Sequence, residues 1–196
     1  MELLFIVGLL ALNGIISWWN CKVVGGIWIE SKKMGGFMHV LAWCGAVQAA
    51  VGFSSVLIFG LAFGAYSFGF LPKEYASAAI SLWYLLIIIP AIGTGLVITV
   101  HSLITAWRER NIANMGIAAW NTFASGMNIY NALDGIPNAW EAVSSVLGGD
   151  SKDKDNDSKA ALLILLVVVA IAGGIFITMG LIRHYAAQTK LQPVAA

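Results

Sequence analysis

Long runs of this chain carry no charged residue. Asp, Glu, Lys and Arg are all absent from residues 3–21, 34–72, 75–107, 111–133 and 160–182. A helix needs about 20 mainly apolar residues to cross a hydrocarbon core of about 30 Å. Only 11% of the whole chain is charged, whereas a soluble domain carries about 25%. These features predict an all-α, polytopic helical membrane protein whose main solvent is the lipid bilayer.

Four of these runs predict transmembrane helices, at Leu3–Trp19, Phe37–Leu61, Ala76–Trp107 and Ala160–Ile182. The acidic Glu2 and the residues after Trp19 do not fit a signal peptide, so the first helix is predicted to stay uncleaved. Glycine pairs at 25–26 and 35–36 predict turns within a basic loop at 20–36. The predicted units are a three-span membrane region (1–110), an amphipathic helix-break-helix segment (111–147), a flexible charged linker (148–159), a final transmembrane helix (160–183) and a short tail (184–196).

The segment 111–147 is less apolar than the four spans. Asn114, Asn121 and Asn128 recur every seven residues, with Ser125 on the same face, and a helix drifts only about 20° per heptad. The run Asp134–Pro137 predicts a break, followed by a short second helix that begins at Asn138. This Asn-striped helix is expected either to form a fifth span or to lie at the membrane interface.

Three interpretations of the Asn stripe stay open. The amides could bond to neighbouring helices and stabilise packing, which contributes about 0.6–2 kcal/mol for each bond. They could instead line a water-filled lumen between subunits, or belong to a helix lying flat on the bilayer. A buried Asn at a heptad position also specifies oligomeric state, which is compatible with the first two interpretations.

Other intramembrane positions are candidates for special roles. Pro90 removes a backbone hydrogen bond and, with Gly93, Thr94 and Gly95, predicts a helix kink. Gly60 and Gly64 form a GxxxG pair, which is typical of close helix packing. His39 and His101 are weak candidates for haem ligands, because two adjacent antiparallel helices could bring them to a similar depth. No metal site and no resident cofactor are expected.

Lys and Arg near the span ends predict the orientation. Residues 20–36 and 108–110 carry the basic side chains and are expected in the cytoplasm, which leaves the N-terminus outside. The side of the C-terminus depends on whether 111–133 crosses the bilayer. We therefore expect a multi-pass protein of the cell membrane, most simply the bacterial inner membrane.

The sequence has no catalytic triad, phosphate-binding loop, paired carboxylates or basic nucleic-acid-binding stripe. It therefore predicts a non-enzymatic membrane protein with no nucleic-acid partner. The leading hypothesis is a structural or scaffolding subunit of an oligomeric bacterial envelope assembly, formed with copies of itself or other membrane subunits. The alternative hypothesis is an oligomeric pore or transporter-like channel whose lumen the Asn stripe lines.

Overall fold

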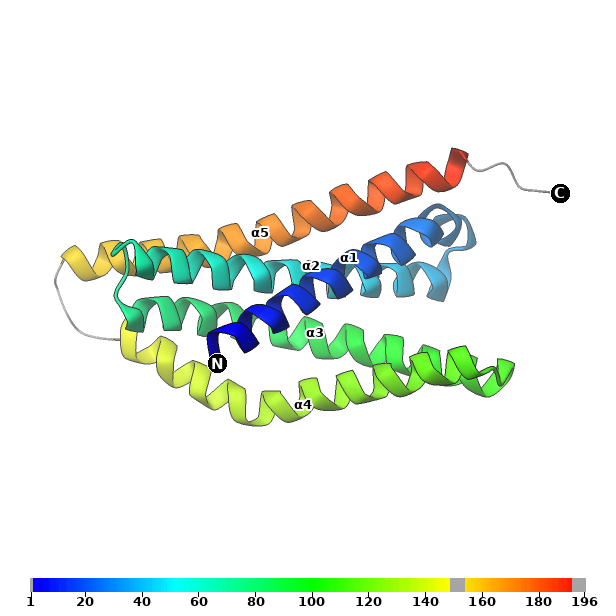
Figure 1. Ribbon diagram of the computed structural model, residues 1–196, viewed down its shortest axis with the longest axis horizontal. Helices are drawn as coiled ribbons and strands as arrows, with labels where there is room; N and C mark the ends of the chain where they lie inside the picture. The colour runs from blue at the N-terminus through cyan, green and yellow to red at the C-terminus, as the bar shows by residue number, and fades with distance from the viewer. Residues whose placement is uncertain (1, 149–153, 192–196) are drawn as a thin grey trace.

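A computed structural model describes residues 2–148 and 154–191, and within these ranges the chain forms five long helices (Figure 1). Their bounds are α1 Glu2–Met34, α2 Gly36–Ser67, α3 Lys73–Glu109, α4 Ile112–Leu147 and α5 Lys154–Leu191. All of α1, α2, α3 and α5 are long and apolar enough to cross a membrane. The all-α, polytopic prediction is therefore confirmed, and α4 is the one helix of the five that falls outside that group.

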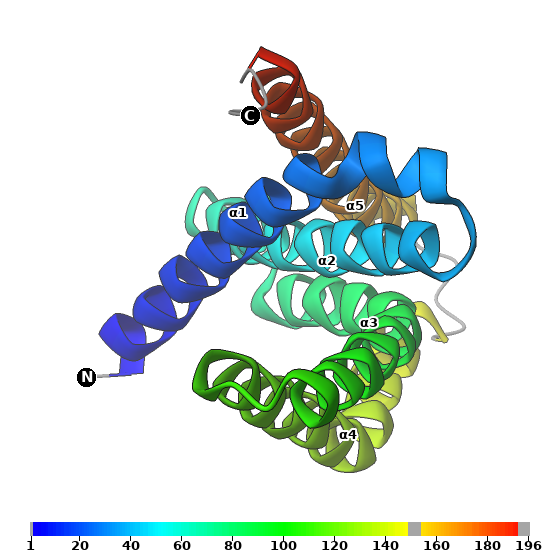
Figure 2. The same cartoon turned by 90° about the vertical axis from the view of Figure 1, so that its right-hand side faces the viewer.

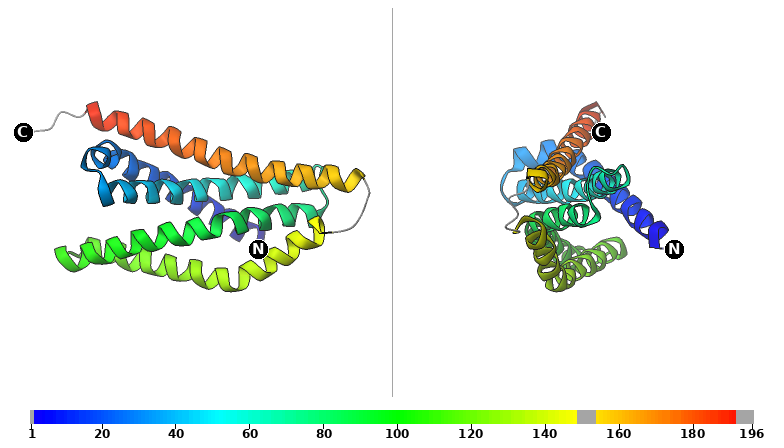
Figure 3. Two further views of the ribbon diagram at one scale, coloured as in Figure 1. Left: turned by 180° about the vertical axis from the view of Figure 1, so that it is seen from behind. Right: turned by 90° about the vertical axis from the view of Figure 1, so that its left-hand side faces the viewer.

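Helices α5, α2, α3 and α4 follow one another as a row, and α1 lies across α2 and α5 (Figure 2). One apolar core joins α1, α2 and α5 around Cys21, Ala46 and Ile182. A second joins α2, α3 and α5 around Ile58, Trp83 and Leu163. Helix α4 contributes no buried residue to either core, although Val146 packs against the second one, and α4 runs antiparallel beside α3 (Figure 3).

Several predicted boundaries were wrong because the helices are longer than the charge-free runs. Residues 20–34 continue α1 and do not form a loop, and the turn falls at Gly35 and Gly36, where φ is 61° and 54°. Gly25 does not break α1 because α5 packs directly on it: a Cβ there would lie 2.5 Å from that of Tyr185. The glycine provides close approach between two helices.

The second half of α4 also differs from the prediction. No break occurs at Asp134–Pro137, since α4 is continuous through Pro137 and Asn138 lies inside the helix. Figure 1 shows that α4 bends in this region toward the start of α3, as a proline in a helix interior allows. Of the predicted linker 148–159, residues 149–153 lie outside the described part, while α5 already begins at Lys154.

The described turns lie at opposite ends of the long axis (Figure 1). The α1–α2 and α3–α4 turns share one end with the C-terminal end of α5, whereas the α2–α3 turn lies at the other end. At the α2–α3 turn, Phe68 and Phe70 are 79% and 69% exposed, as expected for an aromatic hairpin at a membrane interface. Helix α4 therefore returns the chain along α3 before α5 begins.

Candidate functional site

The contact face of α4 toward α3 consists of small side chains in a heptad repeat. Its buried members at seven-residue spacing are Ala118, Ser125, Ala132 and Ala139. Small residues let two helix backbones approach closely. The predicted stripe member Ser125 belongs to this seam, whereas Asn114, Asn121 and Asn128 lie half-buried along its edge.

Hydroxyl groups join the middle of the seam. Thr99 Oγ1 of α3 donates to the Asn121 carbonyl at 3.0 Å and lies 2.8 Å from Ser125 Oγ. The Asn amides do not make the bonds that the packing interpretation predicted, because those of Asn121 and Asn128 have no partner among the described residues. Asn114 donates instead to Glu109 next to the α3–α4 turn. The bonds in the middle of the seam come instead from Thr99, a residue that the sequence did not single out.

Residues of the predicted kink in α3 take part in a neighbouring polar cluster. Helix α3 continues through Pro90, and Thr94 Oγ1 donates to the Pro90 carbonyl at 2.6 Å. Gln48 of α2 donates to Thr94 Oγ1 at 2.7 Å and to the Ala91 carbonyl at 2.6 Å. Of the two glycines, Gly95 faces this cluster: a Cβ there would lie 3.4 Å from Ser125 Oγ, whereas Gly93 faces open space.

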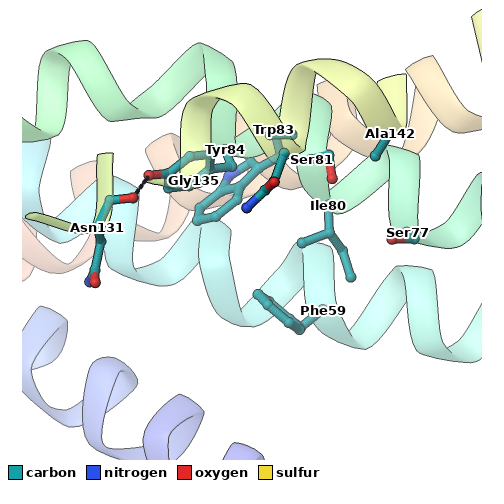
Figure 4. A pocket seen from close by; sticks show the side chains of 11 residues that line it. Phe59, Ser77, Ile80, Ser81, Trp83, Tyr84, Asn131, Gly135 and Ala142 are labelled. Atoms are coloured by element: carbon teal, nitrogen blue, oxygen red, sulfur yellow. Dashed lines mark hydrogen bonds between the residues drawn. The ribbon is translucent and has the colours of Figure 1, made fainter. Parts of the chain in front are cut away.

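Toward the end of the bundle that carries the α2–α3 turn, the seam opens into a groove of about 530 Å³ (Figure 4). Tyr84 marks the point where the groove begins, since its hydroxyl donates to the Asn131 carbonyl at 3.1 Å. Gly135 leaves room for that ring, because a Cβ there would lie 2.6 Å from the Tyr84 oxygen. The groove mixes aromatic and uncharged polar side chains, among them Phe59, Trp83, Ser77, Ser81 and Asn138.

The contacts of Trp83 in α3 show where the part of α4 near Asn131 lies relative to the apolar run of α5. Trp83 Nε1 donates to Ser54 Oγ at 3.0 Å, and Ser54 packs against Gly174 of α5, where an added Cβ would lie 2.8 Å away. Gly174 is inside the charge-free run of α5. Because Asn131 is tied to Tyr84, the neighbour of Trp83, this part of α4 is level with the apolar interior of α5.

At that depth, one flank of α4 is polar and the other is apolar. From Asn128 onward, the first flank carries amides and carboxylates whose side chains have no bonding partner among the described residues: Asn128, Asn131, Asp134, Asn138 and Glu141. Before Asn128 the same flank is mixed, since beside Asn121 it exposes large apolar side chains: Ile117, Trp120 and Met127. The opposite flank exposes large apolar side chains: Met115, Phe123, Leu133, Ile136 and Trp140. Helix α4 is therefore amphipathic around its exposed surface.

Asp134 and Glu141 are the chemically unusual members of this flank. Both are exposed, but only Asp134 lies well inside α4, since Glu141 is six residues from its end. A carboxylate facing lipid at the middle of a membrane helix is unfavourable by about 2.5–3.5 kcal/mol. Because a break was expected at Asp134–Pro137, the place of Asp134 on the surface of α4 was not predicted. The signal was present, since Asp134 and Glu141 are spaced by seven residues like the asparagines.

The structure does not bring the two candidate haem ligands together. His39 Nε2 accepts from Trp43 Nε1 at 3.0 Å, and its Nδ1 lies 3.5 Å from Ser31 Oγ. His101 contacts a different neighbour, with its ring centroid 5.8 Å from that of Phe37. Across residues 2–148 and 154–191, no three His, Cys, Asp or Glu side chains are grouped as metal ligands.

The predicted GxxxG pair faces open space within the described part of the chain. A Cβ on Gly60 or Gly64 would meet nothing within 4 Å. Close helix approaches occur instead at Gly25, Gly52 and Gly174, where an added Cβ would contact Tyr185, Ser17 and Ser54 respectively. Helix packing by Gly60 and Gly64 thus stays a prediction for contacts with another chain.

No known protein family, curated protein or solved structure matches this chain.

Proposed function

We propose that this protein is a non-catalytic membrane subunit that assembles into an oligomeric scaffold through the polar flank of α4. The observation that carries the proposal is the exposure of Asp134 and the neighbouring amides level with the apolar interior of α5. Lipid is a poor solvent for these groups, so a protein partner or water must face them. A second copy that presents the same flank could bond to the amides of Asn128 and Asn131 in a two-fold interface.

This proposal includes α4 as a fifth span. Its partner α3 is a membrane-length helix, and the residues that α4 exposes between Ile112 and Leu133 are uncharged. The C-terminal end of α5 then lies on the same side as Lys33 and Arg108, which we expect to be cytoplasmic because basic residues gather there. A bacterial inner membrane is the membrane that we propose for it.

A pore is the second candidate, and it is favoured by one specific observation. After Asn128, the flank carries two acidic residues, Asp134 and Glu141. Acidic side chains of this kind line the entrance of cation-selective channels. A ring of such flanks from several copies would enclose water between subunits. The two candidates therefore use the same surface of α4. In the scaffold this surface contacts another subunit directly, whereas in the pore it faces water between subunits.

One set of variants separates the two candidates. The test replaces Asn128 and Asp134 together with Leu and measures oligomer mass in mild detergent and ion flux in liposomes. Thr122→Leu is the matched control, because Thr122 is exposed on the other flank and bonds only to its own helix at the Ala118 carbonyl. We expect an oligomeric wild type, a smaller assembly for the double variant and no change for the control.

Flux distinguishes the remaining outcomes. A scaffold should give no wild-type flux. If wild-type flux is robust and is lost in a double variant of unchanged mass, the flank lines a lumen that Leu closes by dewetting. A monomeric wild type in mild detergent and in liposomes would contradict both candidates.

A further inference from the structure

A pocket of about 400 Å³ lies between the start of α2 and the last turns of α3. The helix ends that form it, the start of α2 and the end of α3, lie at the opposite end of the bundle from the α2–α3 turn (Figure 1). Seven residues line it: Phe37, Met38, His101, Ile104, Thr105, Arg108 and Glu109. The polar flank of α4 contributes no residue to this pocket.

Hydrogen-bond donors follow one face of α3 into the pocket. His101, Thr105 and Arg108 are spaced by four and three residues, so they lie along the same side of the helix. None of these three side chains has a hydrogen-bond or ion-pair partner among the described residues. The guanidinium of Arg108 is always charged and carries five N–H donors in a planar fork, which suits a phosphate.

The acidic residue that lines the pocket is already bonded. Glu109 accepts a hydrogen bond from the Asn114 amide across the α3–α4 turn. This contact ties the Glu109 carboxylate to α4, so Arg108 is left available for a ligand. It also gives Asn114, the first member of the predicted stripe, a role different from that of the other asparagines.

The backbone of α2 adds donors at the same place. Its N-cap residue is Gly35, whose lack of a polar side chain leaves the first turn without a side-chain cap. The first amides of a helix have no partner within it, and they carry the positive end of the helix dipole. Phe37 and Met38 of that turn line the pocket.

The outer wall of the pocket is apolar. Phe37 is 53% exposed and Ile104 is 44% exposed, and Trp107 is 76% exposed on the next turn of α3. Lys32 and Lys33 lie in the last turn of α1, just before α2 begins. A ligand here would therefore meet cationic groups at one end and lipid-facing apolar side chains at the other.

We propose that this pocket binds the phosphate headgroup of an anionic phospholipid. Arg108, His101 and Thr105 donate to the phosphate oxygens, and an acyl chain runs along Phe37 and Ile104. Basic pockets between membrane helices recognise such headgroups. The proposal does not depend on the scaffold function, because the α4 flank lies elsewhere.

The test measures lipid binding to the purified full chain by native mass spectrometry. Phosphatidylglycerol is compared with phosphatidylcholine of the same acyl chains, for wild type and for Arg108→Gln. We expect wild type to prefer phosphatidylglycerol, because the choline cation of phosphatidylcholine offsets its phosphate charge. Arg108→Gln should bind phosphatidylglycerol about tenfold more weakly and lose most of this preference. Arg108 is exposed, so this variant is expected to keep the elution profile of wild type in size-exclusion chromatography.

Arg110→Gln is the matched control. It removes the same charge two residues away, but Arg110 stacks over Trp107 at 5.7 Å and does not line the pocket. Equal losses in the two variants would show general charge attraction and overturn the site. Displacement of the lipid by millimolar inorganic phosphate would show that the pocket binds free phosphate, which would overturn the lipid assignment.

Discussion

At the scale of single residues, glycines and small hydroxyl side chains determine how closely the helices approach. Ser54 accepts a hydrogen bond from Trp83 of α3 and packs against Gly174 of α5, so three helices meet at one small residue. Gly52 and Ser17 form a comparable contact between α2 and α1. In lipid there is no hydrophobic driving force between helices, so such close packing carries much of the association.

Replacing Gly174 with Leu should therefore destabilise the bundle. A Cβ there would lie 2.7 Å from the Ala50 carbonyl and 2.8 Å from Ser54 Cβ, so α2 and α5 must separate. Overpacking of this kind lowers the free energy of unfolding by about 1–3 kcal/mol. Gly180→Leu on the same helix is the control, because a Cβ there meets nothing within 4 Å. Thermal unfolding in detergent should show a lower midpoint for Gly174→Leu alone, and equal midpoints would contradict the α2–α5 contact.

At the scale of elements, α1 and α4 show that a break signal in the sequence depends on what the helix packs against. The two adjacent glycines of α1 have different surroundings: Gly25 faces Tyr185 of α5, whereas Gly26 is exposed. Pro137 lies inside α4 and does not end it. Both helices continue because packing on a neighbour outweighs the weak helix propensity of one residue.

Proline at position 26 tests whether residues 20–34 are helical. Gly26→Pro removes a backbone hydrogen bond inside α1 and should lower the free energy of unfolding by about 3 kcal/mol. Gly26→Ala should instead stabilise the protein by up to about 1 kcal/mol, since open space surrounds this position. Thermal unfolding of the two variants gives opposite shifts for a helix. If both variants unfold like wild type, the segment is a loop.

At the scale of the whole molecule, the position of α4 decides the topology. Among the described helices, α3 is the only one with which α4 makes extensive contact. Helix α4 returns the chain to the end of the bundle at which α5 begins. With five crossings, Gln188 near the end of α5 is on the same side as Lys33. With four crossings, Gln188 would be on the side of Lys73.

Single cysteines at Lys33, Lys73 and Gln188 can test this arrangement. All three positions are exposed, and the native Cys21 and Cys44 are buried, so wild type provides the unlabelled background. In intact cells a membrane-impermeant thiol reagent should label position 73 and leave 33 and 188 protected. Labelling of 188 together with 73 would show that α4 does not cross. Labelling of 33 from outside would reverse the proposed orientation.

The sequence by itself determined the class of the molecule. Charge-free runs of membrane length require helices, since every backbone group must bond within its own segment in lipid. The same runs located α2, α3 and α5 to within several residues. Helix ends were less accurate, because charged residues such as Lys22 and Lys159 can lie inside a helix that extends beyond the hydrocarbon core.

Only the tertiary structure decided which side of each helix meets another. Heptad spacing placed Asn121 and Asn128 on one stripe, but it could not show that the small residues Ala118 and Ser125 form the seam. Nor could it show that Asp134 is exposed level with the apolar interior of α5. The physical reason is that spacing specifies the angle of a side chain about its own helix axis, whereas packing against a second helix specifies what lies at that angle.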